Sequence, residues 1–283
     1  MQTLEQLSTR IWYHTPVSET DRPILCVVAG DNKSLMIDAG NSEAHARSFL
    51  GELAARNIRQ PSIVALTHWH WDHIFGLSAL NMTSIASVYT KAEMAKLLPF
   101  EWTDEALDRR VREGVEIEFC ANAIKREYGA SRNIAVKLPD ITFERRLEID
   151  LGGVTCILQH VGGDHAADSI VVYIKEEKIL FLGDCIYADI YNGPRKLTAE
   201  RTLRLLDVLA EFDAETYILS HWKPVSREEY DQEAALLANI AKLTVRFNGS
   251  FERIKQGYEE KLGRSVNEEE LEVMTYFVNG YER

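Results

Sequence analysis

The 283-residue chain has few cysteines and no long apolar run, and each shortage excludes a class of protein. The cysteines form no CxxC pair and are expected to be reduced thiols, most of them in apolar strands, which disfavours a disulfide-stapled secreted domain. No stretch approaches the roughly 20 apolar residues that span a bilayer. Residues 1–16 carry charged side chains and lack the apolar core of a signal peptide. We therefore expect a cytoplasmic protein without membrane association. The four cysteines are Cys26, Cys120, Cys156 and Cys185.

Positive charge is also in short supply. The 32 basic residues are outnumbered by 44 acidic ones, and the net charge is −12. Such a surface repels a polyanion, so the chain is not expected to bind nucleic acid. A small anionic substrate held by a local basic cluster remains compatible with this charge. Hydrophobic residues make up 46% of the chain, which is enough for a substantial core.

The most informative stretch of the chain is Thr67-His68-Trp69-His70-Trp71-Asp72-His73. It follows the apolar run 63–66, which reads as a buried strand that ends and releases polar side chains onto a loop. His68 and His70 are two residues apart, so on an extended backbone they point the same way. Asp72 and His73 come where the chain can turn and aim at a second point. Imidazole with carboxylate suits zinc or iron, and no cysteine is present for a structural thiolate site.

Three more polar side chains follow apolar strands later in the chain. His165 comes after the run 156–158, Asp184 after 179–182 and His221 after 217–219. Each can therefore project from the same edge of a sheet as the first cluster. Taken singly, each is more often an ordinary loop residue; their shared placement favours one common site.

Strand and helix patterns alternate in the first half of the chain, which indicates an α/β arrangement with helices packed on sheets. We expect a helix over residues 43–58, with His45 on its exposed face, and a short strand over 85–89. Residues 91–136 read as a helical insertion whose aromatics either pack on the core or form a lid. From residue 226 helical patterns cover 227–247, 249–262 and 267–279.

The order His68-x-His70-x-Asp72-His73, then His165, Asp184 and His221, resembles the metallo-β-lactamase fold superfamily. The resemblance covers roughly residues 10–225, apart from most of the insertion. It implies an α/β (α+β) fold, a four-layer αββα sandwich with a dinuclear metal site at one edge of the sheets. The domains would then be a catalytic domain over 1–225, with the insertion at about 91–136, and a helical extension over 226–283.

By that resemblance two divalent metal ions are expected, most often zinc, with manganese or iron as options. His68, His70 and His165 would hold the first ion, Asp72, His73 and His221 the second, and Asp184 would bridge them. Asp38 matches an aspartate that orients a ligand imidazole in this fold. The implied reaction is hydrolysis, in which a hydroxide shared by the metals attacks a small acyl substrate and Asp72 handles the proton.

Differences between the ligand residues of this chain and those of other branches of the superfamily narrow the choice of substrate. True β-lactamases of this fold usually lack the carboxylate that Asp184 supplies, and flavodiiron proteins have a glutamate where His70 stands. The remaining resemblance is to hydroxyacyl-glutathione hydrolases and lactonases, which cleave thioesters or lactones. The alternative is a mononuclear iron oxidoreductase of the persulfide dioxygenase type, which uses fewer of these ligands.

Substrate contacts are expected in the segment after Asp184. Arg195 and Lys196 are either a clamp for a carboxylate or two solvated loop cations. Tyr187 and Tyr191 are candidates for hydrogen bonds to the substrate oxygen. His160 is expected to be a packed or supporting histidine and not a ligand. Trp69 and Trp71 should face the core, and Trp222 is a candidate wall of the pocket. The C-terminal helices either close over the site or form a homodimer contact.

Overall fold

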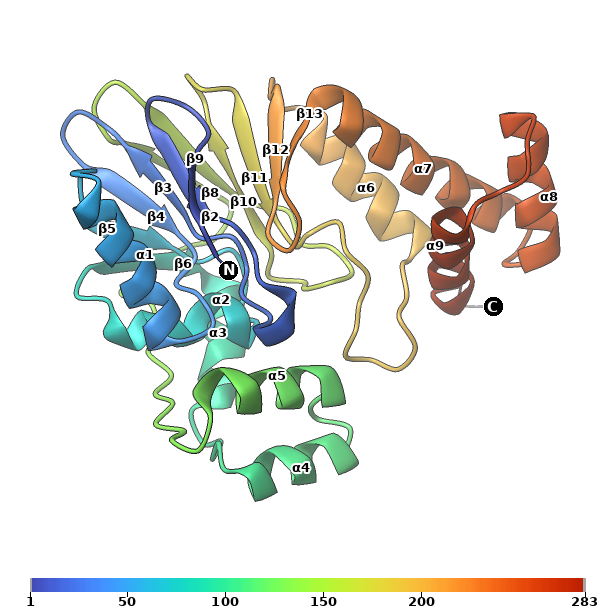
Figure 1. Ribbon diagram of the computed structural model, residues 1–283. Coiled ribbons are helices and arrows are strands. Elements are labelled where there is room, and N and C mark those ends of the chain that lie inside the picture. The colour runs from blue at the N-terminus through green and yellow to red at the C-terminus, as the bar shows by residue number, and fades with distance from the viewer. Residues whose placement is uncertain (1, 282–283) are drawn as a thin grey trace.

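The computed structural model describes residues 2–281, in which two mixed β-sheets pack face to face (Figure 1). The first sheet has the order β1 to β7, antiparallel from β1 to β4 and parallel from β4 to β7. Its strands are β1 (Leu4–Gln6), β2 (Ile11–His14), β3 (Cys26–Ala29), β4 (Ser34–Ile37), β5 (Ile63–Ala65), β6 (Thr83–Ser87) and β7 (Ile141–Phe143).

The second sheet has the order β13-β12-β11-β10-β9-β8 and is antiparallel except for the β11–β12 pair. Because β9, β11 and β12 run in the same direction, their carboxyl ends meet at one edge. Its strands are β8 (Arg146–Asp150), β9 (Thr155–His160), β10 (Ile170–Ile174), β11 (Ile179–Gly183), β12 (Thr216–Leu219) and β13 (Pro224–Ser226).

Helices cover the outer face of each sheet, which confirms the expected four-layer αββα sandwich. The helices α1 (Glu43–Ala55), α2 (Trp71–Ile74) and α3 (Val88–Leu97), with the 3₁₀ helix η2 (Phe75–Ala79), share a core with the first sheet. The helices α6 (Ala199–Leu209) and α7 (Arg227–Arg246) share another with the second sheet. A third core lies between the sheets.

Successive side chains along the central strands point to opposite faces of their sheet, so each of these strands contributes to two of the three cores. In β3, Val27 joins the core under the helices, whereas Cys26 and Val28 face the second sheet. In β11, Leu180 packs toward α6 and α7, and Phe181 faces the first sheet. Both faces of these strands are therefore buried, which is why they read as continuous apolar runs.

Helix α1 begins where predicted but places His45 differently from the prediction. Ser42 caps the helix by accepting a hydrogen bond from the backbone N–H of His45, 3.0 Å away. The helix ends at Ala55, because Asn57 adopts a positive φ of 56°. The expectation that His45 is exposed was wrong: its side chain is fully buried, and its ring lies parallel to that of His14.

The range predicted as a helical insertion, 91–136, holds two helices after α3, and α3 itself begins earlier than this range, at Val88. The expected strand over 85–89 ends at Ser87, whose hydroxyl caps α3, so Val88 and Tyr89 are helical. After α3 come α4 (Asp104–Arg112) and α5 (Glu118–Tyr128). Trp102 joins the core through an edge contact with Phe75, with ring centroids 4.8 Å apart. This contact attaches the insertion to the segment that follows the metal-ligand motif.

The C-terminal helices pack on the second sheet through α6 and α7. They are α7, α8 (Phe251–Leu262) and α9 (Glu268–Asn279), close to the three ranges predicted. Leu237 of α7, Ile254 of α8 and Phe277 of α9 are buried in one core with Leu205 of α6. The tail is therefore docked on the sandwich, at the end of the molecule opposite β1 to β6 (Figure 1).

All four cysteines are free and buried, as the scattered pattern predicted. Only Cys26 and Cys156 lie in strands; Cys120 lies in α5, and Cys185 follows β11, so the expectation that most lie in strands was wrong. Within residues 2–281, no helix is both long enough and apolar enough to cross a bilayer.

Candidate metal centre

The seven predicted ligands come together at one edge of the two sheets. They lie on the loop after β5 (His68, His70), on α2 (Asp72, His73), between β9 and β10 (His165), after β11 (Asp184) and after β12 (His221). The strand β5 ends at Ala65, so His68 and His70 are on a loop, and Asp72 and His73 are on a short helix. Parallel strand direction brings these four connections to the same edge.

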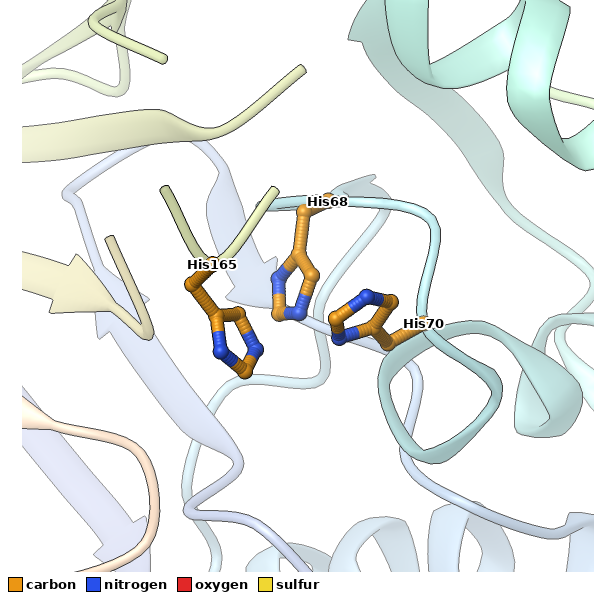
Figure 2. A group of neighbouring side chains, drawn as sticks. All are labelled: His68, His70 and His165. Carbon is orange, nitrogen blue, oxygen red and sulfur yellow. The ribbon is translucent and has the colours of Figure 1, made fainter. Parts of the chain in front are cut away.

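The first group consists of His68, His70 and His165 (Figure 2). The ring centroids of His68 and His70 are 4.6 Å apart, as are those of His70 and His165. Each residue offers one ring nitrogen, and these three nitrogens lie within 4.8 Å of one another. All three side chains are buried.

Hydrogen bonds on the far side of the rings orient these imidazoles. Nδ1 of His165 lies 3.1 Å from the carbonyl oxygen of Ala188, to which it donates. The Thr67 hydroxyl donates to Asp38, so it accepts from Nδ1 of His68 at 3.0 Å. With Nδ1 protonated, Nε2 of each ring presents a lone pair to the centre of the site.

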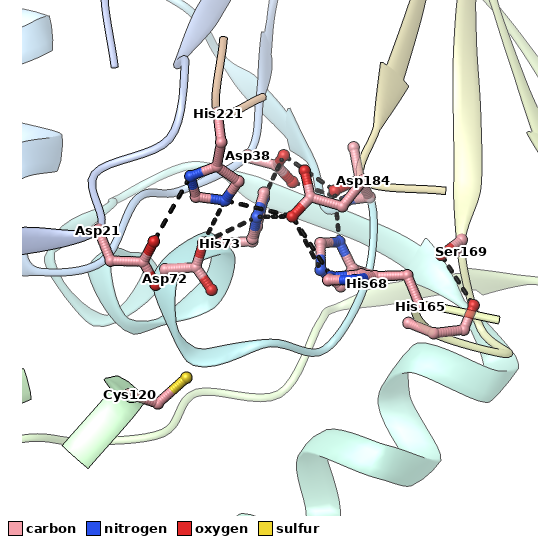
Figure 3. A network of polar contacts seen from close by, with 12 residues as sticks. Asp21, Asp38, His68, Asp72, His73, Cys120, His165, Ser169, Asp184 and His221 are labelled. Atoms are coloured by element: carbon pink, nitrogen blue, oxygen red, sulfur yellow. Dashed lines mark hydrogen bonds and ion pairs between the residues drawn. The ribbon is translucent and has the colours of Figure 1, made fainter. Parts of the chain in front are cut away.

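The second group consists of Asp72, His73, Asp184 and His221 (Figure 3). Oδ2 of Asp184 is 3.3 Å from Nε2 of His73 and 3.2 Å from Nε2 of His221. The same oxygen lies 3.4 Å from Nε2 of His165 in the first group. Asp184 therefore stands between the two groups, where a bridging ligand would stand.

Asp38 holds His73 in place from behind. Its Oδ2 accepts from Nδ1 of His73 at 2.8 Å, and its Oδ1 accepts from the backbone N–H of Thr67 at 2.7 Å. Asp38 is fully buried and has a φ of 60°, in the left-handed region that Asp tolerates better than most residues. One carboxylate thus fixes both the motif loop and a candidate ligand.

Several buried atoms at the centre of the site fit a bound cation. Nε2 of His68, His73 and His165 and Oδ1 of Asp184 have no hydrogen-bond partner among the described residues. Buried polar atoms are nearly always paired, so unpaired ring nitrogens and a carboxylate oxygen that converge need an explanation. Imidazole nitrogens and carboxylate oxygens are ligands that zinc and iron accept. The donor set therefore fits divalent metal ions.

The charges of the two groups differ. Burial lowers the pKa of His68 and of His70 well below the usual histidine value, so both are neutral, as a metal ligand must be. Burial also opposes the charged form of His73 and His221, but the neighbouring carboxylates outweigh it and raise the pKa of both. A cation entering the second group must therefore displace protons.

Asp21 is a site residue that the sequence patterns did not indicate. Its Oδ1 lies 3.5 Å from Nδ1 of His221, on the side of the ring away from Asp72. Burial and repulsion from Asp72 raise the pKa of Asp21 to about 7. Asp21 follows no apolar strand; the hydrogen bond from the N–H of Ile24 to the carbonyl of Ser220 brings its segment here.

Three of the four candidate substrate residues line the cavity over the two ligand groups, and Lys196 does not. Tyr187, Tyr191 and Arg195 line this cavity. Burial raises the pKa of both tyrosines, so each keeps its hydroxyl proton. The Tyr191 hydroxyl donates to the thiol of Cys120, 3.6 Å away. Lys196 is outside the lining: its Nζ donates to the carbonyl of Asn192 and lies 3.8 Å from Asp189.

The surroundings of three further side chains near the ligand motif differ from one another; these are Trp71, Trp69 and His160. Trp71 is buried in the core as expected. Trp69 is not confined to the core: it is half-buried, and its ring contacts those of His70 and Tyr191. His160 is outside both ligand groups, since its Nε2 hydrogen-bonds the Ala167 carbonyl at 2.9 Å.

The fold and the site define a metal-binding αββα sandwich, and comparison with known proteins gives its family. Residues 20–221 match the metallo-beta-lactamase superfamily. The chain therefore belongs to this superfamily, a family of enzymes.

The individual relatives have low sequence identity to this chain. A beta-lactamase-like protein 2 homolog of Caenorhabditis elegans is 26% identical over 195 residues, 67% of this chain and 54% of the relative. An acyl-coenzyme A thioesterase of Gallus gallus is 28% identical over 180 residues, 59% of this chain and 58% of the relative. The chain thus spans about half the length of the curated relatives that it matches.

Solved structures agree on the fold. The sec-alkylsulfatase Pisa1 from Pseudomonas sp. is 15% identical with a TM-score of 0.67, covering 90% of this chain and 45% of that one. A metallo-beta-lactamase from Pontibacter korlensis is 19% identical with a TM-score of 0.59, covering 84% and 100%. At these identities the likeness concerns the fold alone.

Proposed function

We propose that the protein is a metal-dependent hydrolase that cleaves a small acyl substrate, a thioester, a lactone or a related ester. The observation that carries this proposal is the position of Asp184, whose Oδ2 lies 3.4 Å from Nε2 of His165 in the first ligand group and 3.2 Å from Nε2 of His221 in the second. A complete second group supports two divalent ions, most suitably zinc, over the single iron of a persulfide dioxygenase. The thioesterase among the relatives supports the acyl class.

The chain's own side chains divide the work of such a reaction. When bound, two divalent ions would activate water and polarise the acyl carbonyl. Asp184 would hold both metal sites at a set spacing. In the balanced reaction the water oxygen joins the acyl carbon, the C–S or C–O bond breaks, and a proton reaches the leaving atom. Asp72, which lines the cavity, is placed to carry that proton.

Asp72 is kept in the form that accepts a proton. Burial alone would raise its pKa, but the neighbouring His73 and His221 outweigh this and hold its pKa well below the usual range. Its Oδ2 lies 2.9 Å from Nε2 of His73 and 3.1 Å from Nε2 of His221. The carboxylate is therefore ionised and oriented before substrate arrives.

Tyr187 is the better candidate of the two tyrosines for a hydrogen bond to the substrate oxygen. Its ring faces both His165 and His221, with centroids 6.1 and 6.5 Å away. The hydroxyl of Tyr191 is already engaged by Cys120.

The four free thiols also support the cytoplasmic location that we propose.

Metal content and turnover test this proposal together. Protein purified without added metal should contain about two zinc or manganese ions per chain and hydrolyse thioesters or lactones. An Asp184→Asn variant should lose the second ion and at least 100-fold in turnover. His160→Ala, which removes a histidine outside both groups, should keep both. One iron per chain with oxygen consumption would overturn the hydrolase assignment.

A further inference from the structure

The cavity over the metal groups is larger than a minimal ester requires. Its volume of about 560 Å³ lies in the range of roughly 300–1,000 Å³ that accommodates drug-sized ligands. Its wall comes from the insertion, from the loop between β11 and α6, and from α9 of the C-terminal extension. Asp72, Asp184 and His221 form part of its floor. The room beyond the reacting carbonyl is therefore part of the same site.

Two large aromatic side chains at this cavity are more exposed than their size favours. Phe119 of α5 is 54% exposed, and Trp222, directly after His221, is 58% exposed. Both line the cavity, as does Ile190. Exposed aromatics that share a concave surface mark a place where an apolar group binds. They belong to elements far apart in the sequence, so their meeting at one cavity is a feature of the tertiary structure.

Arg195 is the basic side chain of this lining, whose other ionisable groups include three aspartates. Its Nη1 lies 3.4 Å from the hydroxyl of Tyr276, a residue of α9 that also lines the cavity. The Tyr276 hydroxyl also donates to the Glu272 carboxylate, but among the described residues Arg195 itself forms no salt bridge, and such a guanidinium is suited to an anionic group of a ligand. The neighbouring Lys196 is directed toward Asp189 and Asn192.

Helix α9 fixes the loop that carries Arg195. The N–H of Leu197 donates to the carbonyl of Tyr276 at 3.0 Å, and Nδ2 of Asn279 donates to the carbonyl of Arg195 at 2.9 Å. A Cβ on Gly280 would lie 2.2 Å from the carbonyl oxygen of Leu197, so only glycine permits this approach. The loop and α9 lie side by side in Figure 1. The C-terminal extension thus builds one wall of the cavity.

We propose that the substrate is an amphiphilic acyl compound, with an extended apolar chain against Phe119 and Trp222 and one anionic group at Arg195. This inference rests on the proposed hydrolase function and adds the substrate class. The insertion and the C-terminal extension then act as the two specificity elements around a metal centre that the sandwich supplies.

Chain length is the first arm of the test. Thioesters of N-acetylcysteamine with 2 and 10 acyl carbons are compared in the metal-loaded protein. We expect kcat/KM to be at least tenfold higher for the longer chain. Phe119→Ala and Trp222→Ala should each lower the ratio of the decanoyl to the acetyl kcat/KM about tenfold, the scale of one buried aromatic contact. Val115→Ala, an equally exposed apolar side chain of the insertion outside the cavity, should leave this ratio unchanged.

Charge is the second arm. Decanoyl thioglycolate places the anion on the leaving group, and the monothioester of decanedioic acid places it at the end of the acyl chain. At least one should be preferred over the neutral thioester by about tenfold, the scale of a charge-assisted contact. Arg195→Gln should remove that preference, and Lys196→Gln, a cation one residue away, should leave it intact. Equal rates for all three substrates would overturn the anionic part.

The experiments distinguish failure of the hydrolase function from failure of the amphiphilic substrate class. A loaded protein that hydrolyses acetyl and decanoyl thioesters equally well would remain a hydrolase and would overturn the amphiphile. If no thioester, lactone or related ester is hydrolysed, the proposed function fails, and calorimetric binding of decanoate decides the substrate class separately. Decanoate binding that Phe119→Ala and Trp222→Ala weaken would support the cavity assignment; absence of binding would overturn it.

Discussion

At the scale of single residues, the metal centre depends on side chains that hold the ligands from behind. Asp38 accepts a hydrogen bond from Nδ1 of His73, and the Thr67 hydroxyl accepts one from Nδ1 of His68. These bonds select the tautomer and the direction of Nε2. Without them, each buried imidazole could rotate or present the wrong nitrogen. The geometry of the centre is therefore set before a metal arrives.

Replacing Asp38 by asparagine should weaken metal binding about 10- to 100-fold. Asparagine tolerates the positive φ but cannot accept hydrogen bonds at both side-chain positions. Metal affinity is measured by competition with a chelator. Asp140→Asn is the matched control, because Asp140 also accepts from a backbone N–H and a hydroxyl, those of Ser84, away from the site. Equal affinities in both variants would contradict the role of Asp38.

Asp168 should make stability depend on pH. Burial raises its pKa to about 6, from 3.8. The folded chain therefore holds a proton that the unfolded chain releases, and the free energy of unfolding falls as pH rises from about 4 to about 6. Asp168→Asn should stabilise the protein by about 1–3 kcal/mol at pH 8, with little effect near pH 4.

Urea unfolding at the two pH values measures this difference. The exposed Asp207 on α6 provides the control, since Asp207→Asn should shift stability equally at both. A gain from Asp168→Asn that is the same at pH 4 and pH 8 would show that charge burial is not its source.

At the scale of elements, the metal-ligand helix α2 is locked to the turn between β4 and α1. The N–H of Ala39 donates to the carbonyl of His73 at 2.8 Å, and the N–H of Gly76 donates to that of Gly40 at 2.9 Å. A Cβ on Gly76 would lie 2.0 Å from the carbonyl oxygen of Ala39. The backbone of η2 must therefore approach this turn without a side chain between them.

Gly76→Ala should destabilise the protein by at least about 1–3 kcal/mol, because backbone on both sides of the contact must shift. Thermal unfolding measures the change. Gly51→Ala is the control: it lies in α1, where an added Cβ meets nothing within 4 Å, and alanine favours the helix by about 0.5–1 kcal/mol. A harmless Gly76→Ala would show that η2 is free to move from the turn.

At the scale of the whole molecule, the ligands join the two sheets. Four come from the segment after β5 in the first sheet, and three follow strands of the second. A metal bound to residues of both sets would therefore link the two sheets of the sandwich. The insertion and the C-terminal extension complete the cavity from either side.

Metal removal should lower thermal stability. A metal present at 100 times its dissociation constant adds about 2.7 kcal/mol, which for a chain of this size corresponds to roughly 5 °C in Tm. Calorimetric scans with and without a chelator measure the shift. The Asp184→Asn variant should show a smaller one. A chelator that leaves the Tm of the metal-loaded protein unchanged would mean that the centre adds nothing to folding.

Several local features were predictable because they depend on short segments. The burial pattern of β3 and β11, the cap of α1 at Ser42 and the spacing of the His68–His73 motif are all read within a few residues. The wrong predictions concern residues whose burial depends on packing against segments far away in the sequence. His45 is on the polar side of α1 by its pattern, yet the first strands cover it.

By itself, the sequence determined the fold class and the residue types of the candidate centre, because hydrophobic periodicity and ligand spacing are local properties. Only the tertiary structure decided that Asp21 meets His221 and that Arg195, but not Lys196, faces the cavity. It also decided that Phe119 and Trp222 line one cavity. Asp21 and His221 are 200 residues apart in the sequence, and Phe119 and Trp222 are 103 apart. Only sheet order and helix docking bring such segments together.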